Sequence, residues 1–201
     1  MCGLDLEVSS SLKLLGVTID DKLTFEKHVR NIASSIAQKT SLIRKCYKTL
    51  GNNDAVLKSF YAFILPCFEY CSPVWCSASD SHLKLLDRAL NNIRFFLPDI
   101  LINLEKRRNI ACLSILHKIL HKVDHPLHCK LPQFAKPIRI TRHTTQQNDK
   151  AFVLARYNTN QFSRCFTYST TRLWNSLPNE AVLAVKQDRF IVLAKKFLCD
   201  Q

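Results

Sequence analysis

The order of apolar and polar positions predicts several helices that follow one short β element. Residues 11–20 (SLKLLGVTID) are rich in leucine and β-branched residues, are interrupted by Gly16, and end at Asp20, which Asp21 follows. This pattern is typical of a strand or a β-hairpin. We expect the two aspartates to form a turn and to cap the helix that comes next.

The first predicted helix begins at Thr24 and ends before Gly51. A glycine directly after the last apolar position is a typical C-cap, and the apolar positions recur with a helical period. These positions are Phe25, Val29, Ile32, Ala33, Ile36, Ile43, Cys46, Tyr47 and Leu50. The opposite face is basic, with Lys27, Arg30, Lys39, Arg44, Lys45 and Lys48. The segment is therefore expected to bury one face and to present a positive one.

A second helix is predicted from a cap at Asn53 or Asp54, and its apolar side chains lie nearly all round. Such a helix is expected to be buried. Pro66 should bend or end it, because proline lacks the backbone N–H and clashes with the preceding turn.

Two more helices are expected before residue 124. One is capped by Ser79 or Asp80 and runs to Pro98, with Leu83, Leu86, Leu90, Ile93 and Leu97 on one face. The other covers residues 103–123 and is expected to bury Leu104, Ala111, Ile115, Leu116, Ile119 and Leu120.

The pattern changes beyond residue 123. Residues 124–150 lose the apolar period and gain prolines and basic residues, which predicts an extended connector. Residues 151–155 then predict a short strand, residues 170–177 a short helix, and residues 188–198 a final amphipathic helix. The fold class expected is mainly α, with a short N-terminal β-hairpin, a helical bundle, a basic connector and a small C-terminal α(+β) segment. The expected domains are residues 1–23, 24–123 and 124–201.

Tryptophan occurs twice, and Trp75 and Trp174 each stand near the end of an apolar run, close to a proline. Large aromatic side chains contribute heavily to burial. Both indoles are expected to anchor the core.

The charge of the chain favours a polyanionic partner. Its 201 residues include 29 lysines and arginines against 16 acids, a formal charge of +13. Residues 1–100 hold 12 bases and 10 acids, whereas residues 101–201 hold 17 bases and 6 acids. The second half therefore carries most of the positive field. With only 3 glycines, the chain has no glycine-rich phosphate loop, which argues against an enzyme dependent on ATP or NAD.

The N-terminus lacks the order of a signal peptide, and no 18-residue apolar run is present. A nuclear or cytoplasmic location is therefore expected, without secretion and without a membrane partner. The nine cysteines are interpreted as reduced core thiols. Cys67, Cys71 and Cys76 lie in an apolar run and are expected to pack in the core instead of binding a metal.

Candidate chemistry is sparse. Two-metal phosphoryl or nucleotidyl transfer needs several converging carboxylates, but Asp20 and Asp21 are the only adjacent acidic pair. No cofactor and no catalytic residue are predicted. His117 and His121 have the i, i+4 spacing of zinc ligands. No CxxC or HExxH motif accompanies them, so ordinary surface or half-buried histidines are expected, and zinc binding stays an open alternative.

Three collinear segments resemble the region after the catalytic palm in reverse transcriptases of LINE-type (non-LTR), jockey-like retrotransposons. Residues 14–29 (LLGVTIDDKLTFEKHV) are similar to YLGV-x-LD-x-x-L-x-W-x-x-H-I of that family. Residues 60–75 (FYAFILPCFEYCSPVW) are similar to LY-x-x-x-x-RPILEYASPVW, with Leu65 in place of the arginine. Residues 164–178 (RCFTYSTTRLWNSLP) are similar to SFFPRTARLWNSLP.

The resemblance implies a role for each part of the chain. Residues 14–19 would be the palm-edge hairpin that grips the primer, residues 24–97 a helical thumb, and the remainder a basic C-terminal segment. In that family the fingers and the palm with its metal-binding aspartates precede these motifs. The chain is therefore expected to be a non-catalytic C-terminal fragment of an RNA-directed DNA polymerase, and the missing palm and fingers are possible partners.

The expected ligand is RNA or DNA, bound through its backbone phosphates and with weak sequence preference. Two other interpretations remain open: an α-helical protein-interaction module, and an inert degenerate transposon remnant without nucleic-acid function. The residues expected to contact nucleic acid are Lys13, Gly16, Lys27, Arg30, Lys39, Lys45, Arg107, Arg108, Arg139, Arg142, Arg164 and Arg172.

Overall fold

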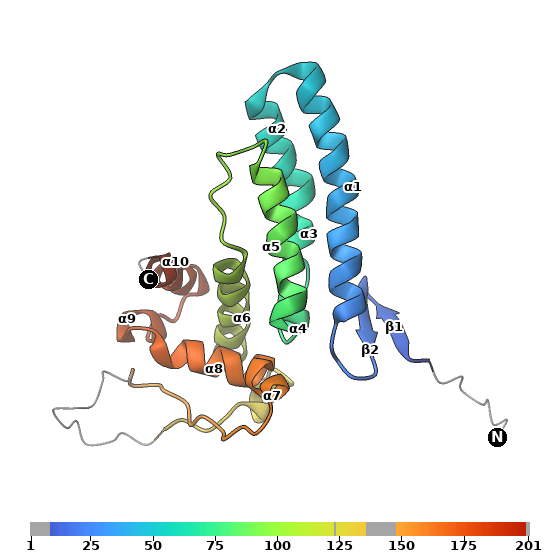
Figure 1. The fold of residues 1–201 in the computed structure, drawn as a ribbon. Coiled ribbons are helices and arrows are strands. Elements are labelled where there is room, and N and C mark those ends of the chain that lie inside the picture. The colour runs from blue at the N-terminus through green and yellow to red at the C-terminus, as the bar shows by residue number, and fades with distance from the viewer. Residues whose placement is uncertain (1–8, 123, 136–147, 200–201) are drawn as a thin grey trace. The chain divides into compact units, whose positions relative to one another are not determined.

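A computed structural model describes residues 9–122, 124–135 and 148–199 of the chain (Figure 1). The expected mainly α fold with a short N-terminal hairpin is confirmed. The chain forms two compact units: unit 1 comprises residues 1–71 and 77–101, and unit 2 comprises residues 72–76 and 102–201. The predicted domains, residues 1–23, 24–123 and 124–201, remain a prediction. Within the described residues, no helix is both long enough and apolar enough to cross a membrane.

Unit 1 begins with an antiparallel hairpin of β1 (Ser11–Leu14) and β2 (Val17–Asp20), in which Leu14 pairs with Val17. The two-residue loop between them has positive φ at both positions, 46° at Leu15 and 85° at Gly16. Such loops match the right-handed twist of the flanking strands and favour glycine. The glycine therefore allows the tight reversal that the sequence pattern indicated.

Helix α1 (Glu26–Leu50) follows and ends as predicted at Gly51, whose φ is 61° and whose N–H donates to the Tyr47 carbonyl. Its N-cap is Phe25 and not Thr24 as predicted, and Phe25 makes no side-chain cap hydrogen bond; Asp20 instead holds the turn that leads into the helix. The Asp20 carboxylate accepts from the Phe25 N–H at 2.7 Å and from the Thr24 N–H at 2.9 Å. Burial by itself would raise the pKa of this carboxyl, but these hydrogen bonds lower it below the usual value.

The second helical segment continues through Pro66, so of the two expected outcomes, a bend or an end, the end is wrong. It consists of α2 (Asn53–Ser59), a π-helical turn (Phe60–Ile64) and α3 (Leu65–Glu69). Pro66 lies in the first turn of α3, where its missing N–H is not needed. The cap is Asn52, one residue before the predicted position, and its side chain accepts from the Ala55 N–H at 3.1 Å.

Helix α5 (Asp80–Arg94) is capped by Ser79, as predicted, and packs against α1. The core of unit 1 lies between α1, the α2 to α3 segment and α5. Its side chains that are less than 2% exposed include Ile36, Phe60, Ile64, Phe68, Leu86 and Ile93.

Unit 2 contains α4 (Ser72–Trp75), α6 (Leu104–His121), a 3₁₀ turn (His128–Lys130), α7 (Asn160–Arg164), α8 (Phe166–Ser176), α9 (Asn179–Val182) and α10 (Gln187–Cys199). Helix α6 packs against α4, α8 and α10. Helix α8 begins four residues before the predicted position, and α10 matches the expected final helix. The strand expected over residues 151–155 is wrong: Phe152 makes one isolated bridge with Phe134.

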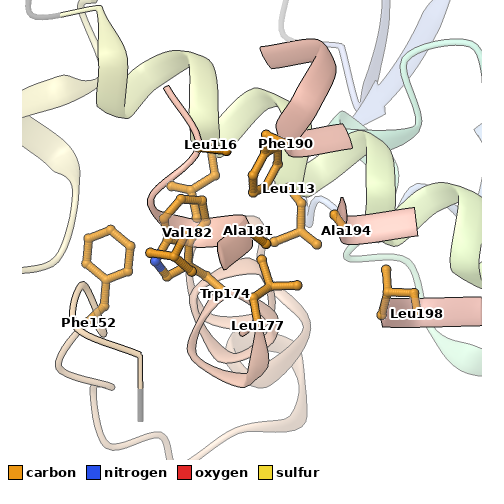
Figure 2. Packing of buried hydrophobic residues seen from close by; sticks show 11 residues of the cluster. Leu113, Leu116, Phe152, Trp174, Leu177, Ala181, Val182, Phe190, Ala194 and Leu198 are labelled. Carbon is orange, nitrogen blue, oxygen red and sulfur yellow. The ribbon is translucent and has the colours of Figure 1, made fainter. Parts of the chain in front are cut away.

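Figure 2 shows the apolar cluster at the centre of unit 2, which comes from α6, α8, α9 and α10 and from Phe152. Trp174 and Trp75 are each 0% exposed, which confirms that both indoles are buried. Leu104, Leu116 and Ile119 of α6 are buried as predicted, but Ile115 is 37% exposed. An amphipathic helix buries one stripe of side chains and leaves others partly exposed.

The cysteines correct a further expectation. All eight cysteines of the described part of the chain are free thiols, but Cys112 alone among them is buried. Cys46, Cys129 and Cys199 are exposed, while Cys67, Cys71, Cys76 and Cys165 are half-buried. A small side chain at the edge of an apolar stripe need not face the core, because its neighbours already complete the packing.

Candidate nucleic-acid interface

A cleft of about 510 Å³ lies in unit 1 between the hairpin, α1, the π-helical turn and α3. It is lined by Lys13, Gly16, Thr18, His28, Asn31, Ile32, Ser35, Lys39, Ala62, Phe63, Pro66, Cys67 and Tyr70. Three residues predicted to contact nucleic acid therefore meet in one cleft: Lys13, Gly16 and Lys39. Two lysines contribute charge to this lining, and none of the lining residues in the described part of the chain is acidic.

One wall of the cleft is held by contacts between the hairpin loop and α3. The Tyr70 hydroxyl donates to the Leu15 carbonyl at 2.7 Å across a sequence separation of 55 residues. A Cβ added at Gly16 would lie 3.4 Å from Cε1 of Tyr70, so the glycine also lets the ring approach the loop. The hairpin tip is thus fixed against the second helical segment.

The floor of the cleft joins β2 to α1. The Nδ1 atom of His28 accepts from the Thr18 N–H at 3.3 Å, and both residues are buried. Burial lowers the pKa of His28, so this imidazole is neutral near pH 7 and acts as an acceptor. His28 therefore orients the hairpin and adds no charge.

Lys39 supplies charge at the other side of the cleft. Its Nζ donates to the Cys67 thiol at 2.9 Å and to the Phe63 carbonyl at 3.2 Å. The Phe63 carbonyl also accepts from the Cys67 thiol at 3.3 Å. These acceptors place the ammonium group at the cleft wall, and an anion in the cleft would approach a cation that is already positioned.

The other predicted contacts of α1 lie outside the cleft lining. Lys27 donates to the Ser11 hydroxyl at 3.1 Å, and Arg30 pairs with Glu26 at 2.8 Å. Lys45 is exposed five residues before the last residue of α1. These side chains add to the positive face of the helix, but they do not line the cleft.

The predicted contacts beyond residue 101 belong to unit 2. Arg107 and Arg172 are exposed, and Arg164 is half-buried. Arg108 is only 8% exposed, because it lies one turn before the buried Cys112 on the inner face of α6. Arg139 and Arg142 lie outside the described residues.

The histidine pair of α6 is part of the packing of unit 2. His117 is 1% exposed, its Nε2 lies 2.7 Å from the Ala184 carbonyl oxygen, and its ring stacks on Phe190. Burial lowers the pKa of His117 and, with the charge of Lys150, that of His121. In the described ranges, no group of three or more histidine, cysteine or acidic side chains is placed to hold a metal ion.

Sequence reasoning missed much of the cleft wall. Thr18, His28, Phe63, Cys67 and Tyr70 line it, yet all five fall inside the segments quoted for the resemblance. That resemblance was the one available signal for them, because an aromatic or apolar residue in a helical run usually indicates core packing.

Comparison with known proteins shows a similarity to a transposon protein. The chain is 30% identical over 89 residues to a probable RNA-directed DNA polymerase from the transposon X-element of Drosophila melanogaster. The alignment covers 42% of this chain and 10% of that protein, so the chain spans a small part of the polymerase that it resembles. No protein-family profile matches the chain. No solved structure matches it. The similarity supports an origin related to transposon reverse transcriptases.

Proposed function

We propose that this chain is a non-catalytic fragment of a non-LTR retrotransposon reverse transcriptase, and that it binds the phosphate backbone of RNA or DNA. The observation that carries the proposal is the cleft of unit 1, where Lys13 and Lys39 meet without a carboxylate in the lining. The likeness to a transposon polymerase supports it as well. In this proposal, α1 is the thumb helix and the hairpin holds the primer side of the cleft.

Backbone recognition suits the chemistry of the cleft. Lysine ammonium groups bind phosphate as point charges and carry no sequence information, so binding is expected to be nearly independent of sequence. The exposed cations of α1 extend the positive surface beyond the cleft. Each phosphate neutralised on a duplex should add about 0.9 to the slope of log affinity against log salt.

The test compares two double variants with the same loss of charge. Lys13→Ala with Lys39→Ala removes the cleft cations, and Lys84→Ala with Arg88→Ala removes two exposed cations of α5 that do not line the cleft. Fluorescence anisotropy with a labelled duplex, from dilute to physiological salt, measures both. The cleft variant should flatten the salt slope by up to about two units, while the control keeps most of it.

A further variant separates charge from folding. Lys39→Arg keeps the positive charge at the cleft wall and should retain binding. Equal salt slopes in the cleft and control variants, or affinity that is insensitive to salt in the parent chain, would refute the proposal. Salt-insensitive behaviour on heparin would favour the helical protein-interaction module or an inert remnant instead.

The fragment is proposed to lack polymerase activity. Asp20, at the end of β2, uses both carboxylate oxygens to accept hydrogen bonds from the Thr24 and Phe25 amides before α1. Primer extension on an RNA template with Mg²⁺ tests this directly. Extension that disappears on substitution of Asp20 or Asp21 would contradict the non-catalytic assignment.

The exposed edge of the hairpin is also a proposed binding site for another part of the parent polymerase. Leu12, Leu14 and Leu15 are 62%, 53% and 82% exposed, and β1 pairs only with β2 in the described part of the chain. An open strand edge beside exposed leucines is a site for further strand pairing. The palm of the parent polymerase is the proposed occupant. Adding a separately made palm and fingers fragment should protect the β1 amides from hydrogen exchange.

A further inference from the structure

A second candidate surface lies in unit 2 and is built from three aromatic rings. Tyr168 of α8 stands between the other two: its ring centroid is 4.9 Å from that of Tyr157 and 6.0 Å from that of Phe162. Tyr157 is 47% exposed and Phe162 is 44% exposed, whereas Tyr168 is half-buried. We call these three residues the aromatic cluster.

The cluster is held by local contacts. The Thr159 hydroxyl accepts from the Phe162 N–H at 3.2 Å and so caps α7, and the Cys165 N–H donates to the Phe162 carbonyl at 3.1 Å. The edge-on contact of Tyr157 with Tyr168, at 66° between the rings, supports the exposed ring from one side. Both outer rings are therefore positioned while they face solvent.

The surrounding sequence contains basic residues and no acidic ones. No acidic residue occurs between Asp149 and Glu180, a stretch that contains Lys150, Arg156, Arg164 and Arg172. Arg172 is exposed and lies four residues after Tyr168 on α8, so the two side chains share a face of that helix. Arg156 is exposed and adjoins Tyr157 in the chain.

We propose that the aromatic cluster is a stacking site for the bases of an unpaired RNA or DNA strand, with the neighbouring arginines contacting its phosphates. This inference rests on the proposed binding of nucleic acid, but it concerns the other unit and a different part of the ligand. Exposed rings combined with a positive surface are the usual features of proteins that bind single strands without sequence preference.

The charge decides between a nucleic acid and a protein as the occupant. A protein partner for a stretch with arginines and no acidic residue would have to bring acidic groups. Apart from the hydroxyls of Tyr157 and Tyr168, the cluster offers only ring faces to orient them. Bases of a single strand bring flat faces and regularly spaced phosphates together, and the face of every base can stack. In a duplex the same faces are already stacked inside the helix, so the site is selective for unpaired strands.

The experiment uses the full chain and two labelled probes of equal length. One is an oligothymidylate, and the other is an abasic oligomer with the same sugars and phosphates but without bases. Anisotropy titrations at one salt concentration give an affinity ratio that isolates stacking from charge. The parent chain should bind the oligothymidylate at least about tenfold more tightly than the abasic strand.

The decisive variant is Tyr157→Leu with Phe162→Leu, which keeps apolar bulk and removes the two exposed rings. It should bring the affinity ratio close to one, and Tyr157→Phe alone should preserve the ratio because the ring remains. Phe95→Leu is the matched control, since Phe95 is an aromatic residue of unit 1 that is 86% exposed. That control should leave the ratio unchanged.

The outcomes separate this inference from the proposed function. A ratio near one in the parent chain, or a ratio that survives the double leucine variant, overturns the stacking site even when Lys13 and Lys39 govern duplex binding. A lost ratio with duplex binding retained supports the stacking site. Should the double variant abolish self-association of the chain in sedimentation and leave the ratio intact, the cluster is a contact between copies and the inference fails.

Discussion

Trp174 offers the sharpest test of the packing in unit 2. The indole is 0% exposed, and its ring centroid lies 5.6 Å from that of Phe190 and 6.1 Å from that of Phe152. Its Nε1 donates to the Lys150 carbonyl at 3.0 Å. The side chain therefore fills the centre of the cluster in Figure 2 and also ties α8 to the chain before residue 151.

Two substitutions separate the contribution of indole packing to stability from that of the hydrogen bond. Trp174→Ala removes the whole indole and leaves a cavity, which should lower the free energy of unfolding of unit 2 by about 3–5 kcal/mol. Trp174→Phe retains most of the apolar volume but leaves the Lys150 carbonyl without its donor, at a cost of about 1–2 kcal/mol. The difference between the two variants measures the packing of the ring system separately from the hydrogen bond.

Hydrogen exchange read by mass spectrometry suits a chain of two units, because it reports the stability of each segment. Amides of α8 and α10 should exchange between roughly a hundredfold and a few thousandfold faster in Trp174→Ala, as a loss of about 3–5 kcal/mol requires. The control is Leu183→Ala, which changes a 49%-exposed side chain of the same unit and should cost less than about 0.5 kcal/mol. If Trp174→Ala costs no more than this control, the indole does not support the core as described.

Three further predictions concern the hairpin and the pair of thiols formed by the half-buried Cys76 and the buried Cys112. Asp20→Ala should destabilise the start of α1 by about 1 kcal/mol in chemical denaturation, whereas Asp21→Ala should not. Because the folded state lowers the pKa of Asp20, its contribution is present above the pKa of the unfolded chain and is lost as pH falls through the folded value. A stability profile of Asp20→Ala that falls in acid as steeply as the parent's would contradict this. Gly16→Ala should lower the stability by about 1–2 kcal/mol because of the positive φ, and it should also perturb Tyr70. Gly51→Ala is the control: its φ of 61° imposes the same backbone strain, but no neighbouring atom lies within 4 Å of the added Cβ. Thermal melting that finds Gly16→Ala as stable as the parent would rule out this strain. A hydrogen bond from the Cys112 thiol lowers the pKa of Cys76, so Cys112→Ala should move the alkylation of Cys76 to higher pH, while Cys112→Ser keeps a donor and should move it less. Peptide mapping after iodoacetamide treatment across pH 6 to about 10 measures the shift, and identical profiles for the two variants would exclude the hydrogen bond as the cause.

Local patterns in the sequence were sufficient for most of the elements. The hairpin loop needs a residue that tolerates positive φ, and Gly16 stands at that position. The caps at Ser79 and Gly51 have equally local causes, because each satisfies backbone groups within one turn. That the segment continues through Pro66 was not predictable, because a π-helical turn precedes the proline and no short-range pattern announces such a turn.

The candidate site was predictable only in its charges. A stripe of basic residues on one helix face follows from periodicity, so Lys39 could be named, but its partner Cys67 is 28 residues away in the sequence. The contact of Tyr70 with Leu15 likewise joins residues 55 positions apart. Whether Arg108 faces solvent or the core depends on how α6 packs within unit 2, since its sequence context looks the same in either case.

The sequence by itself determined the helices, the hairpin, the buried tryptophans and the positive charge, since these depend on side chains a few residues apart. Tertiary structure decided which cations share a cleft and which rings stay exposed. The lysines of the cleft converge only after β1 and α1 are brought together with the π-helical turn, and the aromatic cluster forms only when residue 157 lies against α8. Both arrangements depend on which apolar helix faces pack against one another. That packing is a property of the whole chain, and no short segment determines it.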